Sequence, residues 1–345
     1  MWLEKTSQTI GPNAEDGPLS YSIFQYIDQA PALIHAIQSF TAGYEHFFEV
    51  GKIRLSLEER SMAMTLLCQQ IKMGKTLLSL QFLTCWLLGI SSTFIDEDVF
   101  DIGREHLLAA RTMVDWLVAE SPSLSTDLDR YVVGVYVYWD LTCSMLVDPS
   151  EQLPFINTTV FIQNYISQID IESHPIIGGH IKLFLLLANL GRHCRTVMDT
   201  GCNCPDIEKS FQHSLENWVI SDADIMWQRT VDSFVKHGLI MLYRLCGVPG
   251  NGSDPSADET EAEKDEARRA TIDRLAVGAV KSLLSVPISS SFICLQPIPL
   301  LTAGSELSKD ELDLRRQVVT RFEALFSYNR LPGNMRALEL LQIGD

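Results

Sequence analysis

Apolar side chains recur at steps of three and four residues along most of this chain, and this periodicity constrains the fold more than any other feature. In residues 101–118, one face carries Ile102, His106, Ala109, Met113 and Trp116. This spacing is typical of an amphipathic helix. The helical stretches follow one another without the strand–helix alternation of a parallel sheet. The sequence therefore predicts an all-α fold, a single compact multi-helix domain of ten or more helices.

The same periodicity gives the approximate helix positions. We expect two helices in 21–50, interrupted by Pro31, and further helices at 55–73, 75–89, 101–118, 130–146, 180–197, 206–220, 223–246 and 264–285. The helix at 55–73 is expected to be half buried, on a face formed by Leu57, Met64, Leu67, Cys68 and Ile71. Residues 153–173 are less regular, and we expect a long connection with some helix there.

Two of these helices have a plausible alternative structure. Valines and tyrosines in 130–146 favour a strand locally. The length of this stretch and a capping residue at Asp127 favour a helix instead.

Residues 76–95 contain no charge, as a membrane span would require, but they include Ser79, Gln81 and Gly89. We expect a central core helix here, and no membrane association of the protein.

The stretch from Phe292 to Gln342 combines an apolar run with prolines and small residues. Pro297 and Pro299 do not suit a long regular helix, because a proline lacks an N–H group and restricts the residue before it. Ala303, Gly304 and Ser305 would allow close packing. We expect a kinked segment inserted into the core, followed by two helical pieces separated by residues 331–334.

Composition limits the classes of function. The chain has 345 residues, and 44 acidic against 27 basic residues give a formal net charge of −17. Direct binding of nucleic acid is therefore not expected, since it depends on clustered Lys and Arg. Eight cysteines, several of them in apolar runs, indicate buried free thiols in a reducing compartment. Residues 1–19 are expected to be a flexible segment without a signal peptide.

Candidate phosphate-binding and metal-binding motifs are weak. Residues 247–263 are rich in Gly and acidic side chains and are expected to form a disordered loop rather than a phosphate cradle. Cys202 and Cys204, with His193, Cys194 and His213 nearby in sequence, suggest a zinc site. Structural zinc sites usually separate paired cysteines by two to four residues, and only one residue intervenes here. We expect loop thiols, with no metal, cofactor or catalytic residue.

An acidic run, Asp96 to Asp101, is the sharpest enzymatic feature. In an all-α protein, an aspartate-rich motif at a helix end can hold magnesium ions that bind a diphosphate. Asp224, Gln228 and Asp232 lie four residues apart and could supply a second metal site. This resembles a class I terpenoid synthase acting on a prenyl diphosphate, but the second motif departs from that family's pattern at two positions. The competing interpretation is that Asp96 and Asp98 cap the next helix.

Eight short blocks occur in a characteristic order. They are PALIHAIQSFTAGY within 30–44, HLLAAR at 106–111, YWDLTCSML within 131–146, HPIIGGHIKLFLLLANL at 174–190, LENW within 207–218, IMLYRLC at 240–246, PIPLLTAGSE at 297–306, and Gly333-Asn334 followed by ALELL at 337–341. Together they resemble the fungal-specific transcription factor domain, the regulatory region that usually follows a binuclear zinc-cluster DNA-binding domain. The resemblance covers residues 20–342 and supports a helix at 130–146.

The resemblance implies a transcription regulator in the nucleus and not an enzyme. It implies an all-α regulatory domain over residues 20–345 that contacts other transcription regulators or a second copy of itself. It also implies a small-molecule effector and control of a fungal secondary-metabolite gene cluster. Two departures stand out. Residues 1–19 contain none of the six cysteines of the zinc-cluster module, and Gln296 stands where the family tends to carry tryptophan.

Overall fold

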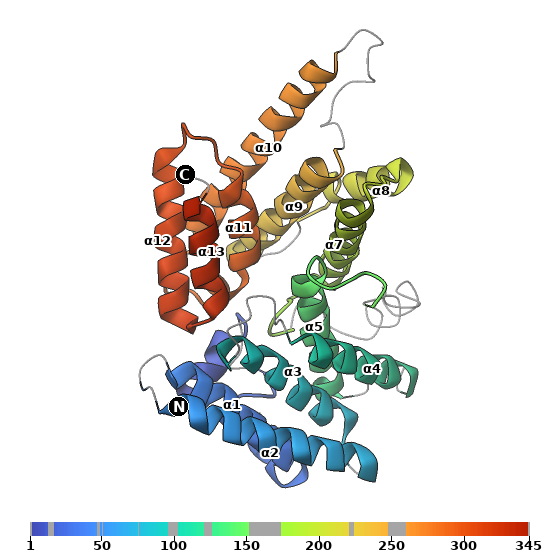
Figure 1. Ribbon diagram of the computed structural model, residues 1–345, viewed down its shortest axis with the longest axis vertical. Coiled ribbons are helices and arrows are strands. Elements are labelled where there is room, and N and C mark those ends of the chain that lie inside the picture. Colours follow the sequence, from blue (N-terminus) through green and yellow to red (C-terminus); the bar gives the residue numbers. More distant parts are fainter. Residues whose placement is uncertain are drawn as a thin grey trace. The chain divides into compact units, whose positions relative to one another are not determined.

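The computed structural model describes residues 2–12, 17–46, 49, 51–74, 76–95, 103–120, 126–151, 174–220, 224–247 and 260–343 (Figure 1). Throughout these ranges the regular elements are helices, and no strand occurs. The predicted all-α fold of ten or more helices is confirmed. The helices group into two compact units, which are described separately: Met1–Leu185 with Phe326–Gly333, and Leu186–Leu325 with Asn334–Asp345.

Unit 1 begins with the short helical elements η1 (Trp2–Thr6), η2 (Ser7–Thr9) and η4 (Tyr21–Gln29), followed by the helices α1 (Pro31–His46), α2 (Lys52–Met73), α3 (Leu78–Ile95), α4 (Arg104–Glu120) and α5 (Asp127–Cys143). The predicted break at Pro31 is confirmed, since Pro31 begins α1. The predicted flexibility of residues 1–19 stays a prediction.

Helix α3 lies in the core of unit 1. Five of its large side chains are completely buried, namely Leu80, Phe82, Leu83, Leu87 and Leu88. The prediction of a core helix here is confirmed. Among the helices that the structure describes, none combines the length and the apolar character that crossing a membrane requires.

Helices α1 and α2 approach closely because small residues lie between them. Ser39 Oγ donates to the backbone oxygen of Ser56 (2.9 Å), and Ser56 Oγ donates to the backbone oxygen of Ser39 (2.8 Å). Ala63 is completely buried two turns further along α2. This reciprocal pair satisfies two buried hydroxyls, which would otherwise carry a desolvation cost.

The predicted buried face of α2 is wrong. Of the five residues expected on it, only Leu67 is buried, while Leu57, Met64, Cys68 and Ile71 are exposed. The predicted face of α4 is confirmed at Met113, which is buried, but Trp116 is 56% exposed. The other buried residues, Leu107, Ala110, Val114 and Leu117, lie one position beyond those predicted. Both helices carry more apolar residues than one face can bury, so periodicity alone did not select the inward side.

Helix α5 confirms the choice of a helix for 130–146, although its cap differs. Thr126 is the N-cap, and its side chain accepts a hydrogen bond from the Asp129 N–H (3.1 Å). The predicted cap, Asp127, is instead the first helical residue.

A late segment of the chain also belongs to unit 1: the Tyr44 hydroxyl donates to the backbone oxygen of Tyr328 (3.2 Å), across 284 residues of sequence.

Unit 2 takes most of α7 (Ile181–Thr200), then α8 (Pro205–Glu216), α9 (Ile225–Leu245), α10 (Glu261–Leu284), η6 (Ser291–Leu295), α11 (Pro297–Ser305), and the greater parts of α12 (Leu312–Asn329) and α13 (Pro332–Ile343). Helix α10 starts with a capping box formed by Thr260 and Glu263. These residues end the acidic loop predicted at 247–263, most of which lies outside the described residues. The less regular connection predicted at 153–173 also lies outside the described residues.

The segment expected to be kinked is a nine-residue helix, α11. Pro297 stands at its first position, where the missing N–H group costs nothing. Ala303 is completely buried, and a Cβ atom added at Gly304 would lie 2.9 Å from Val318 Cγ1. The predicted close packing is confirmed at these two residues, whereas Ser305 is exposed.

Arg321 of α12 joins this region to the end of α10. Its guanidinium donates to the backbone oxygen of Leu284 (2.9 Å), the last residue of α10, and to that of Val286 (3.0 Å), two residues beyond the helix. Gln296 connects the same elements, because its Nε2 donates to the backbone oxygen of Leu283 (3.0 Å) and its Oε1 accepts from Arg321 (3.4 Å). The glutamine that replaces the family's tryptophan is therefore a buried polar link.

Candidate functional site

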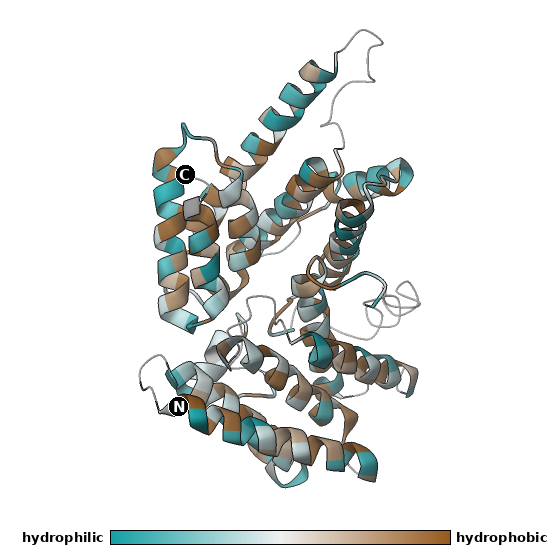
Figure 2. Cartoon of the chain, viewed as in Figure 1, coloured by the Kyte–Doolittle hydropathy of each residue, from teal (hydrophilic) through white to brown (hydrophobic). Residues whose placement is uncertain are grey.

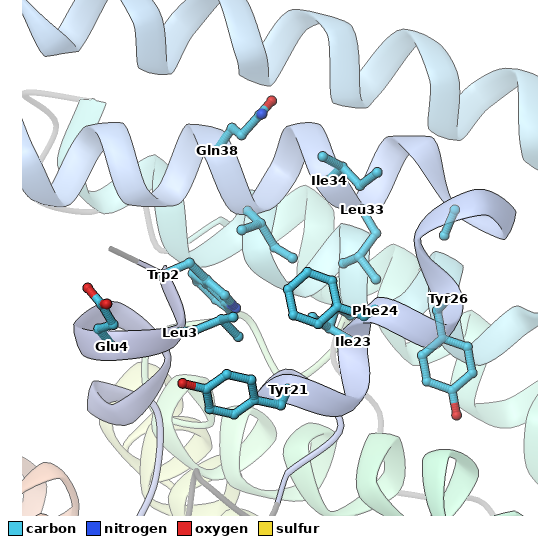
Figure 3. Close-up of a pocket in the computed structure, with 12 residues that line it drawn as sticks. Trp2, Leu3, Glu4, Tyr21, Ile23, Phe24, Tyr26, Leu33, Ile34 and Gln38 are labelled. Carbon is cyan, nitrogen blue, oxygen red and sulfur yellow. The ribbon is translucent and has the colours of Figure 1, made fainter.

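An apolar pocket lies beside the first helical turns of unit 1 (Figure 3). It has a volume of about 510 Å³ and is lined mainly by Trp2, Leu3, Ile23, Phe24, Leu33 and Ile34. The Trp2 indole N–H donates to the backbone oxygen of Leu19 (2.8 Å), which fixes the ring as one wall. Tyr21 and Phe24 remain 68% and 58% exposed at the rim. Small-molecule sites typically have this size and apolar character.

A second hollow continues from this pocket toward α2. It shares Trp2, Ile37 and Gln38 with the first and reaches Leu55 and Glu59. Its far side is held by an ion pair between His35 Nδ1 on α1 and Glu59 Oε2 on α2 (2.6 Å). The apolar surface of unit 1 therefore extends from the first turns of the chain to the beginning of α2.

Helix α2 itself leaves six large apolar side chains exposed, by between 39% and 59%. They are Leu55, Leu57, Met62, Met64, Ile71 and Met73. Because successive residues advance by about 100°, they form two stripes, one on each flank of the helix, with Glu58, Thr65 and Lys72 on the ridge between them. In Figure 2, brown apolar and teal polar segments alternate along α2. We call this face of α2, including both stripes and the ridge, the α2 surface.

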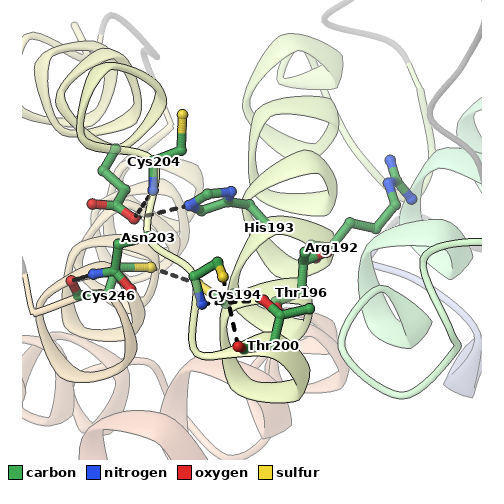
Figure 4. Close-up of polar contacts among 10 residues, drawn as sticks. Arg192, His193, Cys194, Thr196, Thr200, Asn203, Cys204 and Cys246 are labelled. Carbon is green, nitrogen blue, oxygen red and sulfur yellow. Dashed lines mark hydrogen bonds and ion pairs between the residues drawn. The ribbon is translucent and has the colours of Figure 1, made fainter.

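A cluster of polar and sulfur-containing side chains occurs in unit 2 (Figure 4). His193 Nε2 lies 3.2 Å from Glu208 Oε1, and the thiol sulfurs of Cys194 and Cys246 lie 3.9 Å apart. One atom each of His193, Glu208 and Cys246 lies within 4.8 Å of the others. Glu208 also accepts the backbone N–H of Cys204 (3.0 Å). Cysteine, histidine and glutamate are all ligands of zinc in proteins.

The residues considered for zinc binding in the sequence separate into two groups. His193 and Cys194 belong to the cluster, whereas Cys202 is exposed and His213 lies on α8 in a contact with Asn217 Nδ2 (3.1 Å). Cys246, at the end of α9, was not considered because it lies far away in sequence. No local pattern indicates this approach, which depends on how α7, α8 and α9 pack.

The residues of the synthase hypothesis have local roles where they are described. Asp224 caps α9 by accepting the Met226 N–H (2.7 Å), and Asp232 pairs with Lys236 (2.5 Å). Asp96, Asp98 and Asp101 lie outside the described residues.

Residues from the recognisable sequence blocks lie mainly in the core. His174 is stacked on the Tyr131 ring, with centroids 5.6 Å apart. Its Nδ1 accepts the N–H groups of Ile176 and Ile177, and its Nε2 donates to the backbone oxygen of Tyr131 (3.2 Å). A Cβ atom on Gly134 would collide with this ring. Burial lowers the pKa of His174 to about 4, so the ring is neutral at physiological pH.

A second buried histidine occurs in unit 2. His237 on α9 forms a hydrogen bond through Nδ1 to the Thr302 hydroxyl of α11 (2.9 Å). Burial also lowers its pKa to about 4. Both histidines therefore act as neutral hydrogen-bonding groups of the fold, and neither is suited to act as a general base near pH 7.

Comparison with known proteins places the chain in a family. No curated protein and no solved structure matches it. The sequence model described as the fungal specific transcription factor domain matches residues 2–342, nearly the whole chain. This match agrees with the ordered blocks around His174, Pro297 and Gly304, which the structure places in the cores of the two units. The chain therefore belongs to the fungal-specific transcription factor domain family.

Proposed function

We propose that this protein is a non-catalytic regulator of transcription that works as a homodimer, paired through the α2 surface. Membership of the family supports the regulatory role. The formal charge of −17 argues that another chain touches DNA, because phosphate binding needs clustered basic residues. The observation that carries the proposal is the exposure of Leu57, Met64 and Ile71 on one flank of α2. Large contiguous apolar patches are rare on the surfaces of monomeric proteins, and where they occur they often mark protein interaction sites.

The charges on the ridge of α2 favour a second copy of the same helix. In an antiparallel pair centred near Thr65, Glu58 of each copy would lie opposite Lys72 of the other. Two such contacts, related by twofold symmetry, would fix the register of the pair. Within one chain, Glu58 already forms an ion pair with Arg54 (2.8 Å), but both side chains are largely exposed and such a pair contributes little.

The mass of the protein in solution tests this pairing. We expect light scattering to give a dimer for the wild type and a monomer for the Met64→Glu, Ile71→Glu double variant. Met198→Glu is the matched control, because Met198 is 59% exposed on α7, outside the α2 surface. A wild-type monomer, or a double variant that still dimerises, would contradict pairing through α2.

A charge exchange provides a second test of the register. Glu58→Lys should weaken the dimer at low salt, and the double variant Glu58→Lys, Lys72→Glu should restore it. Because these charges are exposed, the effect is expected to shrink as ionic strength rises. Equal weakening by the single and the double variant would rule out the antiparallel register.

The pocket beside Trp2 is proposed to take a small apolar effector. Its volume of about 510 Å³ and the aromatic residues Trp2, Tyr21 and Phe24 support this role. A thermal-shift screen of apolar metabolites would identify ligands, and a change in tryptophan fluorescence that a Trp2→Phe variant abolishes would place them beside Trp2. An Ile34→Glu variant should lose both signals. A ligand whose binding does not change in that variant binds elsewhere.

The biological role is proposed to be control of a secondary-metabolite gene cluster from within the nucleus. Deleting the gene and profiling transcripts should then change the expression of neighbouring genes. Restoring the monomeric Met64→Glu, Ile71→Glu variant should not rescue that expression. Loss of a metabolite without any change in transcripts would favour the enzyme hypothesis instead.

A further inference from the structure

Four potential metal ligands from three helices meet inside unit 2. Helix α7 supplies His193 and Cys194, the first turn of α8 supplies Glu208, and the end of α9 supplies Cys246. Cys194 is completely buried, and Glu208 and Cys246 are 4% and 3% exposed. Three of the four are thus almost entirely removed from water, on elements whose positions are fixed by packing.

We propose that His193, Cys194, Glu208 and Cys246 bind a structural zinc ion. A tetrahedral zinc ion with bonds of about 2.0–2.3 Å holds its ligand atoms about 3.3–3.8 Å apart. The observed separations are 3.2 Å between His193 Nε2 and Glu208 Oε1, and 3.9 Å between the two sulfurs. The ligand atoms of His193, Glu208 and Cys246 also lie within 4.8 Å of one another. Cys194 reaches this group through its 3.9 Å contact with Cys246, so its thiol would move toward the other ligands when the metal binds.

The charges of the cluster favour a divalent cation. Cysteine binds zinc as a thiolate, and thiolates beside a buried carboxylate are costly unless a positive charge compensates them. Zn²⁺ would compensate two of the three negative charges of the Glu208 carboxylate and the two thiolates, with His193 as a neutral ligand. A cap on α8 explains why Glu208 accepts the Cys204 N–H (3.0 Å), but it does not explain the two sulfurs beside the carboxylate.

The sequence alone does not predict this site, because its two cysteines lie far apart along the chain. Cys202 and Cys204, separated by one residue, are exposed and half-buried, respectively. The thiol that approaches Cys194 is Cys246, and Asn203 Nδ2 donates to the backbone oxygen of Cys246 (2.5 Å). The connection between α7 and α8 thus holds the end of α9 in place beside the cluster.

Zinc content tests the proposal directly. The full-length chain, without a histidine tag, is prepared under reducing conditions, incubated with zinc and desalted, and metal and protein are then quantified. We expect one zinc ion per chain. Cys246→Ser and His193→Ala should each lower the apparent zinc affinity at least tenfold, and Cys194→Ser should do the same. Cys202→Ser and His213→Ala are matched controls and should bind zinc as the wild type does.

Cobalt reports on the geometry independently of zinc content. Co²⁺ in the wild type should give the intense visible bands of tetrahedral coordination together with a thiolate charge-transfer band. Cys246→Ser should reduce the charge-transfer band. Circular dichroism in the presence of a chelator checks that each variant is folded, so that loss of metal is not a consequence of unfolding.

Three results would overturn the proposal. The first is a folded wild type that binds no zinc after incubation. The second is unchanged zinc binding in both Cys246→Ser and His193→Ala. The third is a disulfide between Cys194 and Cys246 in protein prepared without reductant, with zinc unable to bind after reduction. These outcomes do not depend on the role in transcription, because they are measured on the isolated chain.

Discussion

Helices α2 and α11 both have small residues where they contact neighbouring helices, yet they differ in whether their larger apolar side chains are buried or exposed. In α2, Ser56 and Ala63 face inward, and Leu57 and Met64 are 46% and 44% exposed. In α11, Leu300 is completely buried together with Ala303. Helix α11 therefore buries its large side chain Leu300, whereas α2 leaves several of its own exposed to solvent.

Acid should have the largest effect, and it acts on the side of α11. The pKa of His237, which holds Thr302, is about 4 in the folded protein against 6.5 as a free side chain. Its stabilising contribution is therefore complete above pH 6.5 and is lost as the pH falls toward 4. A shift of this size corresponds to about 3 kcal/mol. Urea unfolding at several pH values would measure it.

A substitution at His237 separates its contribution from that of His174, whose pKa is lowered similarly. His237→Asn keeps a hydrogen-bonding side chain and removes the titrating group. The loss of stability between pH 6.5 and 4 should then be roughly halved. An unchanged pH dependence in this variant would show that His237 does not titrate as a buried group.

Filling the close contact of α11 should have the next largest effect. Gly304→Leu would place side-chain atoms against Val318 Cγ1, which lies 2.9 Å from the position of a Cβ atom. Overpacking of this kind costs about 1–3 kcal/mol. Gly333→Leu is the matched control, because nothing lies within 4 Å of a Cβ atom there. Equal melting temperatures for the two variants would show that Gly304 is not closely packed against Val318.

The inward face of α2 should be sensitive, but less so. Ser56→Ala removes the hydroxyl that donates to the backbone oxygen of Ser39 (2.8 Å) in a buried contact. We expect a loss of about 1 kcal/mol in the free energy of unfolding. Ser61→Ala, on the exposed side of the same helix, should change it much less. If both variants are equally stable, the close contact of α1 and α2 does not depend on the serine pair.

The outward face of α2 should contribute least to the stability of the monomer. Leu57→Gln and Met64→Gln alter exposed side chains and are each expected to change the free energy of unfolding by less than about 0.5 kcal/mol. The measurement should be made in dilute solution, because pairing of chains stabilises the folded state. A large loss in dilute solution would mean that these residues belong to the core after all.

The sequence predicted the helices better than their orientation. Spacing at 101–118 and length at 130–146 were sufficient to identify α4 and α5, because local hydrogen bonding sets a helix. The inward side of α2 was predicted wrongly, because its inward face is formed by Ser56, Ala63, Leu67 and Gln70. Small and polar residues carry no hydropathy signal, although they allow the closest approach of two helices.

The polar cluster of unit 2 shows the same limit more strongly. His193 and Cys194 attracted notice through their sequence neighbours, but Cys246 is separated from Cys194 by 52 residues. No periodicity connects them, since their meeting depends on how α7 and α9 pack. Conversely, Gly304 was identified correctly, because a glycine among apolar residues has a direct steric meaning.

The contact between Tyr44 and Tyr328 has a consequence for biosynthesis. Unit 1 is built from residues 1–185, but it also includes residues 326–333, which the ribosome makes only after the 140 residues of 186–325. At about 5–20 residues per second, the nascent first unit waits on the order of ten seconds for its final segment. During that interval its unfinished surface is open to chaperones, and any early stop of translation leaves it permanently incomplete.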